Sequence, residues 1–217
     1  MSISWLATGT MLTGWGTVGS AIAIGIATFA GRRALSDYRA QKLTDRQIFV
    51  AENALTAAYA AQDAVEGIRG RWMPAAELHA TEEQLKDLGM DLDGMSEAEK
   101  SAYLQRGVIY RRAEFFKADF DAIFAAIPAV RAYFSQTSVD ALKQFPRARN
   151  RILTSSDMLP MMASGDDRED RELYRSVRSD VFGLGGTEEK DQIQDLLQAA
   201  MEKLENELLP IVRPENK

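Results

Sequence analysis

The chain contains no cysteine and a single histidine, and both absences exclude chemistry. Without cysteine there is no disulfide framework and no thiolate nucleophile. A metal site built from several histidines is excluded as well, and any Ser-His-Asp unit would depend on His79 alone. His79 lies near Glu77, Glu82 and Glu83 in a polar stretch, where an exposed histidine is the simpler interpretation. The sequence therefore predicts no metal and no cofactor.

Motifs for binding phosphate or nucleic acid are missing too. The glycine-rich stretch at residues 183–186 has neither the lysine nor the preceding strand that a phosphate-binding loop requires. No Glu-x-x-His pair is present for a di-metal bundle. The net charge is −6 and no basic face dominates, so we predict no nucleic-acid partner. These absences favour a protein that is not an enzyme, and they single out no catalytic residue.

Charged side chains are absent from residues 1–31, and this uncharged stretch is the most informative feature of the sequence. It includes Trp5, Trp15, Gly25 and Phe29 and is longer than the ~20 apolar residues that a membrane-spanning helix needs. Trp5, an amphipathic aromatic residue, suits the outer membrane interface. A cleaved signal peptide would need basic residues before its apolar part, and a buried soluble helix would seldom be so rich in glycine. We predict a transmembrane anchor here.

Arg32 and Arg33 directly follow the uncharged stretch and open a basic segment over residues 32–46. Lys and Arg next to a membrane span stay on the cytoplasmic side. We therefore expect the N-terminus outside, the segment 32–46 beside the membrane, and a cytoplasmic domain over residues 47–217. This orientation places the protein in the inner (plasma) membrane, with the lipid bilayer as its first partner.

Small residues recur four apart within the stretch, as in Ala21 and Gly25 or Ala27 and Gly31. Such spacing makes a flat strip on one helix face and lets two helices approach closely. The spacing is compatible with a homodimer through the span, which is worth testing. An aqueous pore is disfavoured, because pores are usually lined by polar residues.

Apolar residues in the remaining chain recur at helical spacing, and alternating strand patterns are nearly absent. We predict an all-α fold, with one N-terminal transmembrane helix followed by a cytoplasmic bundle of about four helices. The first helix should continue from the membrane to about Gly70, and residues 74–95 should form a polar connection. Ser96 and Glu99 predict a capping box at the start of the next helix.

The helix after Ser96 carries the strongest amphipathic pattern of the chain, which we interpret as a core stripe. Pro128 should kink or break this helix. The stripe consists of Ile109, Ala113, Phe116, Phe120, Ile123, Ile127, Val130 and Phe134. A shorter helical region over residues 139–159 is interrupted by Pro146, and Thr187 should cap the final helix.

Several segments together carry a resemblance. The basic segment leads into a helix with AENAL at residues 51–55, YAAQDAV at residues 59–65 and Ile68-Arg69, and the chain closes with LPIVRP at residues 209–214. With the aromatic helix between them, they resemble a loosely defined group of bacterial membrane-anchored helical proteins. The resemblance spans most of the chain and implies an anchored all-helical architecture. The group has no established activity, so the resemblance implies no catalytic residues.

Three functions from different classes fit these features. The one we favour is a membrane-anchored interaction or scaffold protein whose helical domain recruits a cytoplasmic partner protein. The second is a membrane effector that oligomerises through its span. The third is a ligand-binding or enzymatic helical bundle whose site carries no recognisable motif.

One local feature suggests a binding surface. Lys143, Arg147 and Arg151 recur at four-residue spacing, so on a helix they lie along one side. Such a row would contact anionic lipid head groups or an acidic partner protein. The alternative is neutralisation by the acidic run at residues 166–172 or by surface acids elsewhere, and we favour that alternative.

Overall fold

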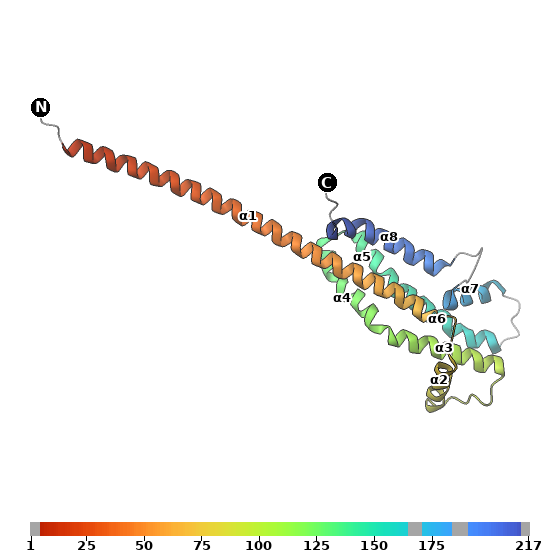
Figure 1. The fold of residues 1–217 in the computed structure, drawn as a ribbon. Helices are drawn as coiled ribbons and strands as arrows, with labels where there is room; N and C mark the ends of the chain where they lie inside the picture. The colour runs from red at the N-terminus through yellow and green to blue at the C-terminus, as the bar shows by residue number, and fades with distance from the viewer. Residues whose placement is uncertain (1–4, 165–170, 184–190, 214–217) are drawn as a thin grey trace. The chain divides into compact units, whose positions relative to one another are not determined.

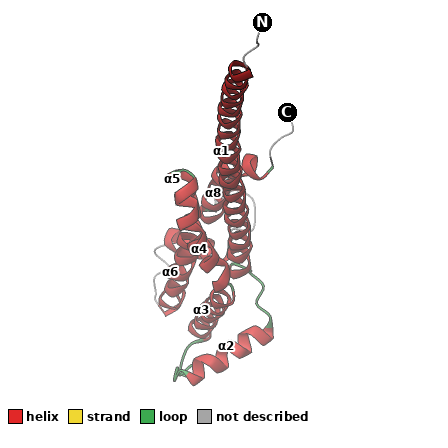
Figure 2. Cartoon of the chain, turned by 90° about the vertical axis from the view of Figure 1, so that its left-hand side faces the viewer, coloured by secondary structure: helices red, strands yellow, loops and turns green. Residues whose placement is uncertain are grey.

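The described part of the chain consists of helices joined by short connections. The computed structural model describes residues 5–164, 171–183 and 191–213, and in the first helix it describes side chains at Phe29 and from Gly31 onward. No strand occurs within these ranges, which confirms the all-α prediction (Figures 1 and 2). The helices are α1 (Trp5–Ile68), α2 (Ala75–Asp87), α3 (Glu97–Phe115), α4 (Lys117–Tyr133), α5 (Gln136–Leu142), α6 (Gln144–Ser164), α7 (Arg171–Phe182) and α8 (Gln192–Val212).

The expected number of about four bundle helices was too small. Helices α2 to α8 accompany the second part of α1. Single residues, Phe116 and Lys143, separate α3 from α4 and α5 from α6, and neither is a glycine or a proline. Helix ends without a local breaker residue are set by packing between helices, which a pattern along the sequence does not contain.

The chain divides into two compact units, residues 1–47 and residues 48–217. In the first unit every side chain from Gly31 to Arg46 is exposed, including Leu35, Tyr38 and Leu43. The ammonium of Lys42 lies 5.8 Å from the centre of the Tyr38 ring. This stretch of helix therefore has no core of its own within the unit.

The membrane span receives no support from the described residues. Among them, no helix is long and apolar enough to cross a membrane. Trp5, Trp15 and Gly25 belong to α1, but their side chains lie outside the described part of the structure. Phe29, at 70% exposure, is the one predicted span residue with a described side chain. The transmembrane helix stays a prediction.

An alanine-rich face of α1 forms the centre of the second unit. The helix buries Ala51, Ala54, Ala58, Ala61 and Ala64 together with Leu55, Val65 and Ile68. Alanine adds little bulk, so neighbouring helices approach α1 closely. The apolar faces of α3 to α8 join the same core.

Helices α3 and α4 confirm the amphipathic stripe but not its predicted break. Ser96 caps α3 with the expected box: its hydroxyl accepts from the Glu99 amide at 3.3 Å, and the Glu99 carboxylate accepts from the Ser96 amide at 2.9 Å. All eight stripe residues are buried or packed against the core. The helix breaks at Phe116, whereas Pro128 lies inside α4. Pro128 was expected to kink or break the helix; the break does not occur there, and a kink at Pro128 stays a prediction.

Residues 74–95 are not simply a polar connection, because they contain α2. Pro74 precedes this helix, and Thr81 is its buried residue. The Thr81 methyl lies against Gly107 of α3, where an added Cβ would clash with it. A glycine in α3 thus lets α2 pack closely (Figure 2).

Two further local expectations changed. Pro146 lies in the first turn of α6 instead of interrupting a helix, a position where its missing N–H costs nothing. Thr187, the expected cap of the final helix, lies outside the described residues. Helix α8 begins after Asp191, whose carboxylate accepts from the amides of Ile193 and Gln194.

Candidate functional site

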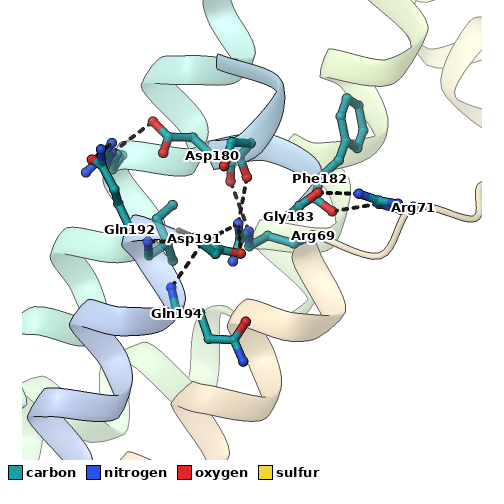
Figure 3. Close-up of polar contacts among 11 residues, drawn as sticks. Arg69, Arg71, Asp180, Phe182, Gly183, Asp191, Gln192 and Gln194 are labelled. Atoms are coloured by element: carbon teal, nitrogen blue, oxygen red, sulfur yellow. Dashed lines mark hydrogen bonds and ion pairs between the residues drawn. The ribbon is translucent and has the colours of Figure 1, made fainter. Parts of the chain in front are cut away.

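A polar cluster joins the end of α1 to the end of α7 and the start of α8 (Figure 3). Arg69 follows the last residue of α1 and donates to the Ser179 and Asp180 carbonyls at 2.6 and 3.0 Å. The same guanidinium contacts both carboxylate oxygens of Asp191 at 2.9 and 2.7 Å. The side chains of Arg69 and Asp191 are only 10% and 12% exposed, so water screens the pair little.

Arg71 satisfies the next carbonyls of α7. It donates to Phe182 at 3.3 Å and to Gly183 at 2.6 Å. Gly183 has a φ of 68°, the left-handed conformation in which helices commonly end and which glycine adopts without strain. Two arginines therefore bind the carboxyl end of α7, where the helix dipole favours positive charge.

Asp180 extends the cluster toward α6. Its carboxylate accepts from Arg151 at 2.9 Å and from the Ser155 hydroxyl at 2.9 Å. Arg151 also donates to Gln192 at 2.7 Å. Asp180 is 6% exposed, so these contacts offset the cost of burying its charge.

The cluster is built to hold helices together. Arg69, Arg71, Asp180 and Asp191 are each engaged by another protein group. Among the described residues, no three His, Cys, Asp or Glu side chains gather closely enough to hold a metal ion. His79 lies on α2 at 3.6 Å from Glu83, with 74% of its side chain exposed.

Two residues of the basic row Lys143, Arg147 and Arg151 form ion pairs within the protein. Lys143 pairs with Asp140 at 2.9 Å, and Arg151 pairs with Asp180 at the same distance. Arg147 is exposed. Residues 166–170 of the acidic run lie outside the described part, so neutralisation by them is not visible. Contact with anionic lipid stays the alternative to neutralisation, and Arg147 is the member of the row most available for it.

An open groove with exposed apolar walls lies between α2 and α3. Its volume is about 1030 Å³. Phe115 and Leu88 line it and are 81% and 76% exposed, and Tyr110 is 40% exposed. Exposed apolar side chains gathered in one hollow are typical of a binding surface.

Arginines line the same groove and are fixed in place. Arg112 binds the Glu77 carboxylate at 2.9 and 2.7 Å and the carbonyls of Gly70 and Trp72, which ties the α1–α2 connection to α3. Arg106 pairs with Asp157 at 2.7 Å. Burial, with a hydrogen bond to Asp157, raises the pKa of the Tyr110 hydroxyl, which therefore stays protonated.

Comparison with known proteins adds no relative. No protein-family model matches the chain, and neither does any curated protein sequence or any solved structure. The function must therefore be argued from the molecule itself. The sequence missed both the cluster and the groove, because their residues come from segments that only the fold brings together.

Proposed function

We propose that this protein is a membrane-anchored helical interaction module that binds a cytoplasmic partner protein through the α2–α3 groove. The observation that carries the proposal is the groove itself, with Phe115 and Leu88 held out of the core. Neither side chain is buried in the core. Exposed apolar groups of this size lower the solubility of a protein, and here burial gives no stability in exchange. Binding of a partner would remove this apolar surface from water.

The ring orientation at the end of α3 supports the proposal. Phe115 and Phe116 meet edge to face, with ring centres 5.0 Å apart. Phe116 packs against the core, whereas Phe115 faces outward. The inner ring thereby fixes the position of the outer one, and a preorganised aromatic side chain loses little entropy on binding.

The groove also favours a particular kind of partner. Arg111 donates to the Glu77 carbonyl and the Thr81 hydroxyl, both neutral groups, each at 3.3 Å. Its charge remains available beside the apolar wall. A partner segment with an apolar side chain next to an acidic one would satisfy both features.

The anchor completes the proposal. Residues 1–31 lack charged side chains and precede Arg32 and Arg33, both exposed, so we place the span in the inner membrane and the helical domain in the cytoplasm. A tether would keep the partner at the membrane. Dimerisation through the span rests on residue spacing alone and is a separate expectation.

Site-specific photocrosslinking in the native host tests the proposal. A photoreactive phenylalanine replaces Phe115 in one variant and Phe124 in another; Phe124, on α4, is 55% exposed and does not line the groove. We expect a discrete crosslinked protein from position 115 and none from position 124. Phe115→Ser should prevent capture of the same protein and leave the melting temperature unchanged. Equal crosslinking at both positions, or none at 115, would contradict the proposal.

A further inference from the structure

A second cavity lies between α3 and α7, on a different part of the helical domain from the α2–α3 groove. Its volume is about 700 Å³, within the range of pockets that hold small molecules. Its apolar walls come from the α1–α2 connection, α2, α3 and α7 and consist of Met73, Leu78, Leu104 and Phe182. The cavity therefore offers space and apolar surface to a ligand.

The charged residues around this cavity are mostly positive. Arg71, Lys100, Arg175 and Arg178 line it, against Glu97 as the one lining carboxylate. The chain as a whole carries a net charge of −6. Positive groups are thus concentrated at a cavity in an acidic protein, which favours an anion there.

Most of this positive charge has no carboxylate beside it among the described residues. Lys100 pairs with Glu82 at 3.0 Å. Arg71 binds only the carbonyls of Phe182 and Gly183, which are neutral. Arg175 is exposed and forms no ion pair within the described ranges. An anionic group entering the cavity would meet guanidinium groups with which no carboxylate of the described residues is paired.

Neutral aromatic side chains hold Arg178 in position, so its positive charge is not neutralised by these contacts. Its guanidinium carbon lies 5.6 Å from the ring centres of both Tyr174 and Phe182, and it donates to the Tyr174 hydroxyl at 2.9 Å. Stacking on aromatic rings orients the guanidinium and leaves other N–H groups for an acceptor. The same Phe182 ring belongs to the apolar wall, so charged and apolar surfaces adjoin.

We propose that this cavity binds a small amphipathic anion, a molecule with a carboxylate or phosphate head and an apolar body. The head would contact Arg71, Arg175 and Arg178, and the body would lie against Met73 and Leu104. This inference is independent of partner recruitment by the α2–α3 groove. It would make the protein a ligand-responsive module.

A matched pair of probes tests the charge requirement with the full chain. 4-Phenylbutyrate and 4-phenylbutylamine share one apolar body and differ in the sign of the head charge. We expect saturable binding of the carboxylate, at least tenfold tighter than that of the amine, and weakening as salt rises. Inorganic phosphate should compete weakly, since it lacks the body. Equal binding of both probes, or no saturable binding of the carboxylate, would overturn the proposal.

Variants and a local probe test the place of binding. Arg175→Gln removes an exposed group with no role in packing and should weaken 4-phenylbutyrate binding about tenfold; Lys203→Gln, on α8, makes the same charge change elsewhere and should have no effect. The ¹³C methyl resonance of Met73, assigned with Met73→Leu, should shift on titration with 4-phenylbutyrate. An unchanged affinity in Arg175→Gln, or a Met73 resonance that does not move, would place binding elsewhere and reject the cavity.

Discussion

At the junction of α1, α7 and α8, a single residue makes several of the polar contacts between helices. Arg69 alone joins Asp191 and two carbonyls of α7. Arg69→Ala would leave a nearly buried carboxylate without its partner, and breaking such a pair typically costs about 3–5 kcal/mol. We expect a loss of that size in the free energy of unfolding, measured by urea denaturation of the full chain.

Two further variants identify the source of that loss. Arg69→Ala combined with Asp191→Asn removes the unpaired charge and should recover part of the stability, because the residual amide still caps α8. Lys203→Ala deletes an exposed cation of α8 and should change the unfolding free energy by no more than about 0.5 kcal/mol. A loss in Arg69→Ala as small as that of Lys203→Ala would show that the cluster contributes little.

Glu207 makes the stability depend on pH. Burial raises the pKa of its carboxyl, but hydrogen bonds from the Ser135 hydroxyl, the Ser138 hydroxyl and the Ser135 amide outweigh burial and hold the pKa below its ordinary value of 4.5. A carboxyl whose pKa is lowered by folding stabilises the folded state above its unfolded pKa, and this contribution is lost as the pH falls through the folded pKa.

Glu207→Gln should therefore destabilise the protein at neutral pH and have a smaller effect in acid. Urea midpoints of the wild type and the variant, compared at pH 7 and at pH 3, measure the difference. We expect the gap between the two proteins to narrow at pH 3. A gap of constant size would mean that the carboxylate charge has no part in fastening α5 to α8.

At the scale of helices, the packing of α1 depends on close approach. A Cβ added at Gly67 would lie 2.6 Å from the Phe116 ring. Glycine within a helix costs roughly 0.5–1 kcal/mol relative to alanine, so replacing it normally stabilises. Here we expect Gly67→Ala to lower the melting temperature, because the ring must move away from the core.

A second substitution, at Phe116, tests whether the contact between position 67 and the Phe116 ring causes this loss. Phe116→Leu shortens the side chain that meets position 67, so the double variant should be less destabilised than the sum of the two single changes. Thermal unfolding of the four proteins gives the coupling. Strict additivity would show that the contact between residue 67 and the ring does not limit packing.

The helix-scale prediction from sequence succeeded where the determinants are local. Ser96 and Glu99 lie three residues apart, and their spacing alone predicted the start of α3. The stripe through Ile109 and Phe120 likewise repeats at helical period, so its burial was foreseeable. Local capping and periodicity thus identified the central elements of the bundle.

Prediction failed where partners are distant in the chain. Phe116 ends α3 without a glycine or proline, and its ring lies against Gly67 of α1, 49 positions earlier in the chain. Arg69 and Asp191 are 122 positions apart, and no spacing rule relates them. The cavity between α3 and α7 has the same cause, since its lining combines residues 71–105 with residues 174–183. The groove between α2 and α3 comes from the nearer residues 67–116, but its walls form only when these helices pack against each other.

At the scale of the molecule, the core belongs to one of the two units. Its members begin at Val50, and no core residue precedes that position in the part of α1 with described side chains. Deleting residues 1–47 should therefore leave the melting temperature of the helical domain within a few degrees of the full chain. Circular dichroism of fragment 48–217 measures it, and a fragment that fails to fold would show that the first unit contributes to the core.

The same deletion of residues 1–47 also tests whether the N-terminal stretch anchors the protein in the membrane. If residues 1–31 cross the membrane, the full chain should stay in the membrane fraction after alkaline carbonate washing, whereas fragment 48–217 should appear in the soluble fraction. Because Arg32 and Arg33 follow the uncharged stretch, reporters fused after Lys217 should be active only when they require the cytoplasm. Replacing both arginines with glutamine should reduce this preference, since the charge bias that sets orientation would be weakened. Release of the full chain by carbonate would reject the anchor, while retention with a reporter active only outside would keep the anchor and reverse the orientation.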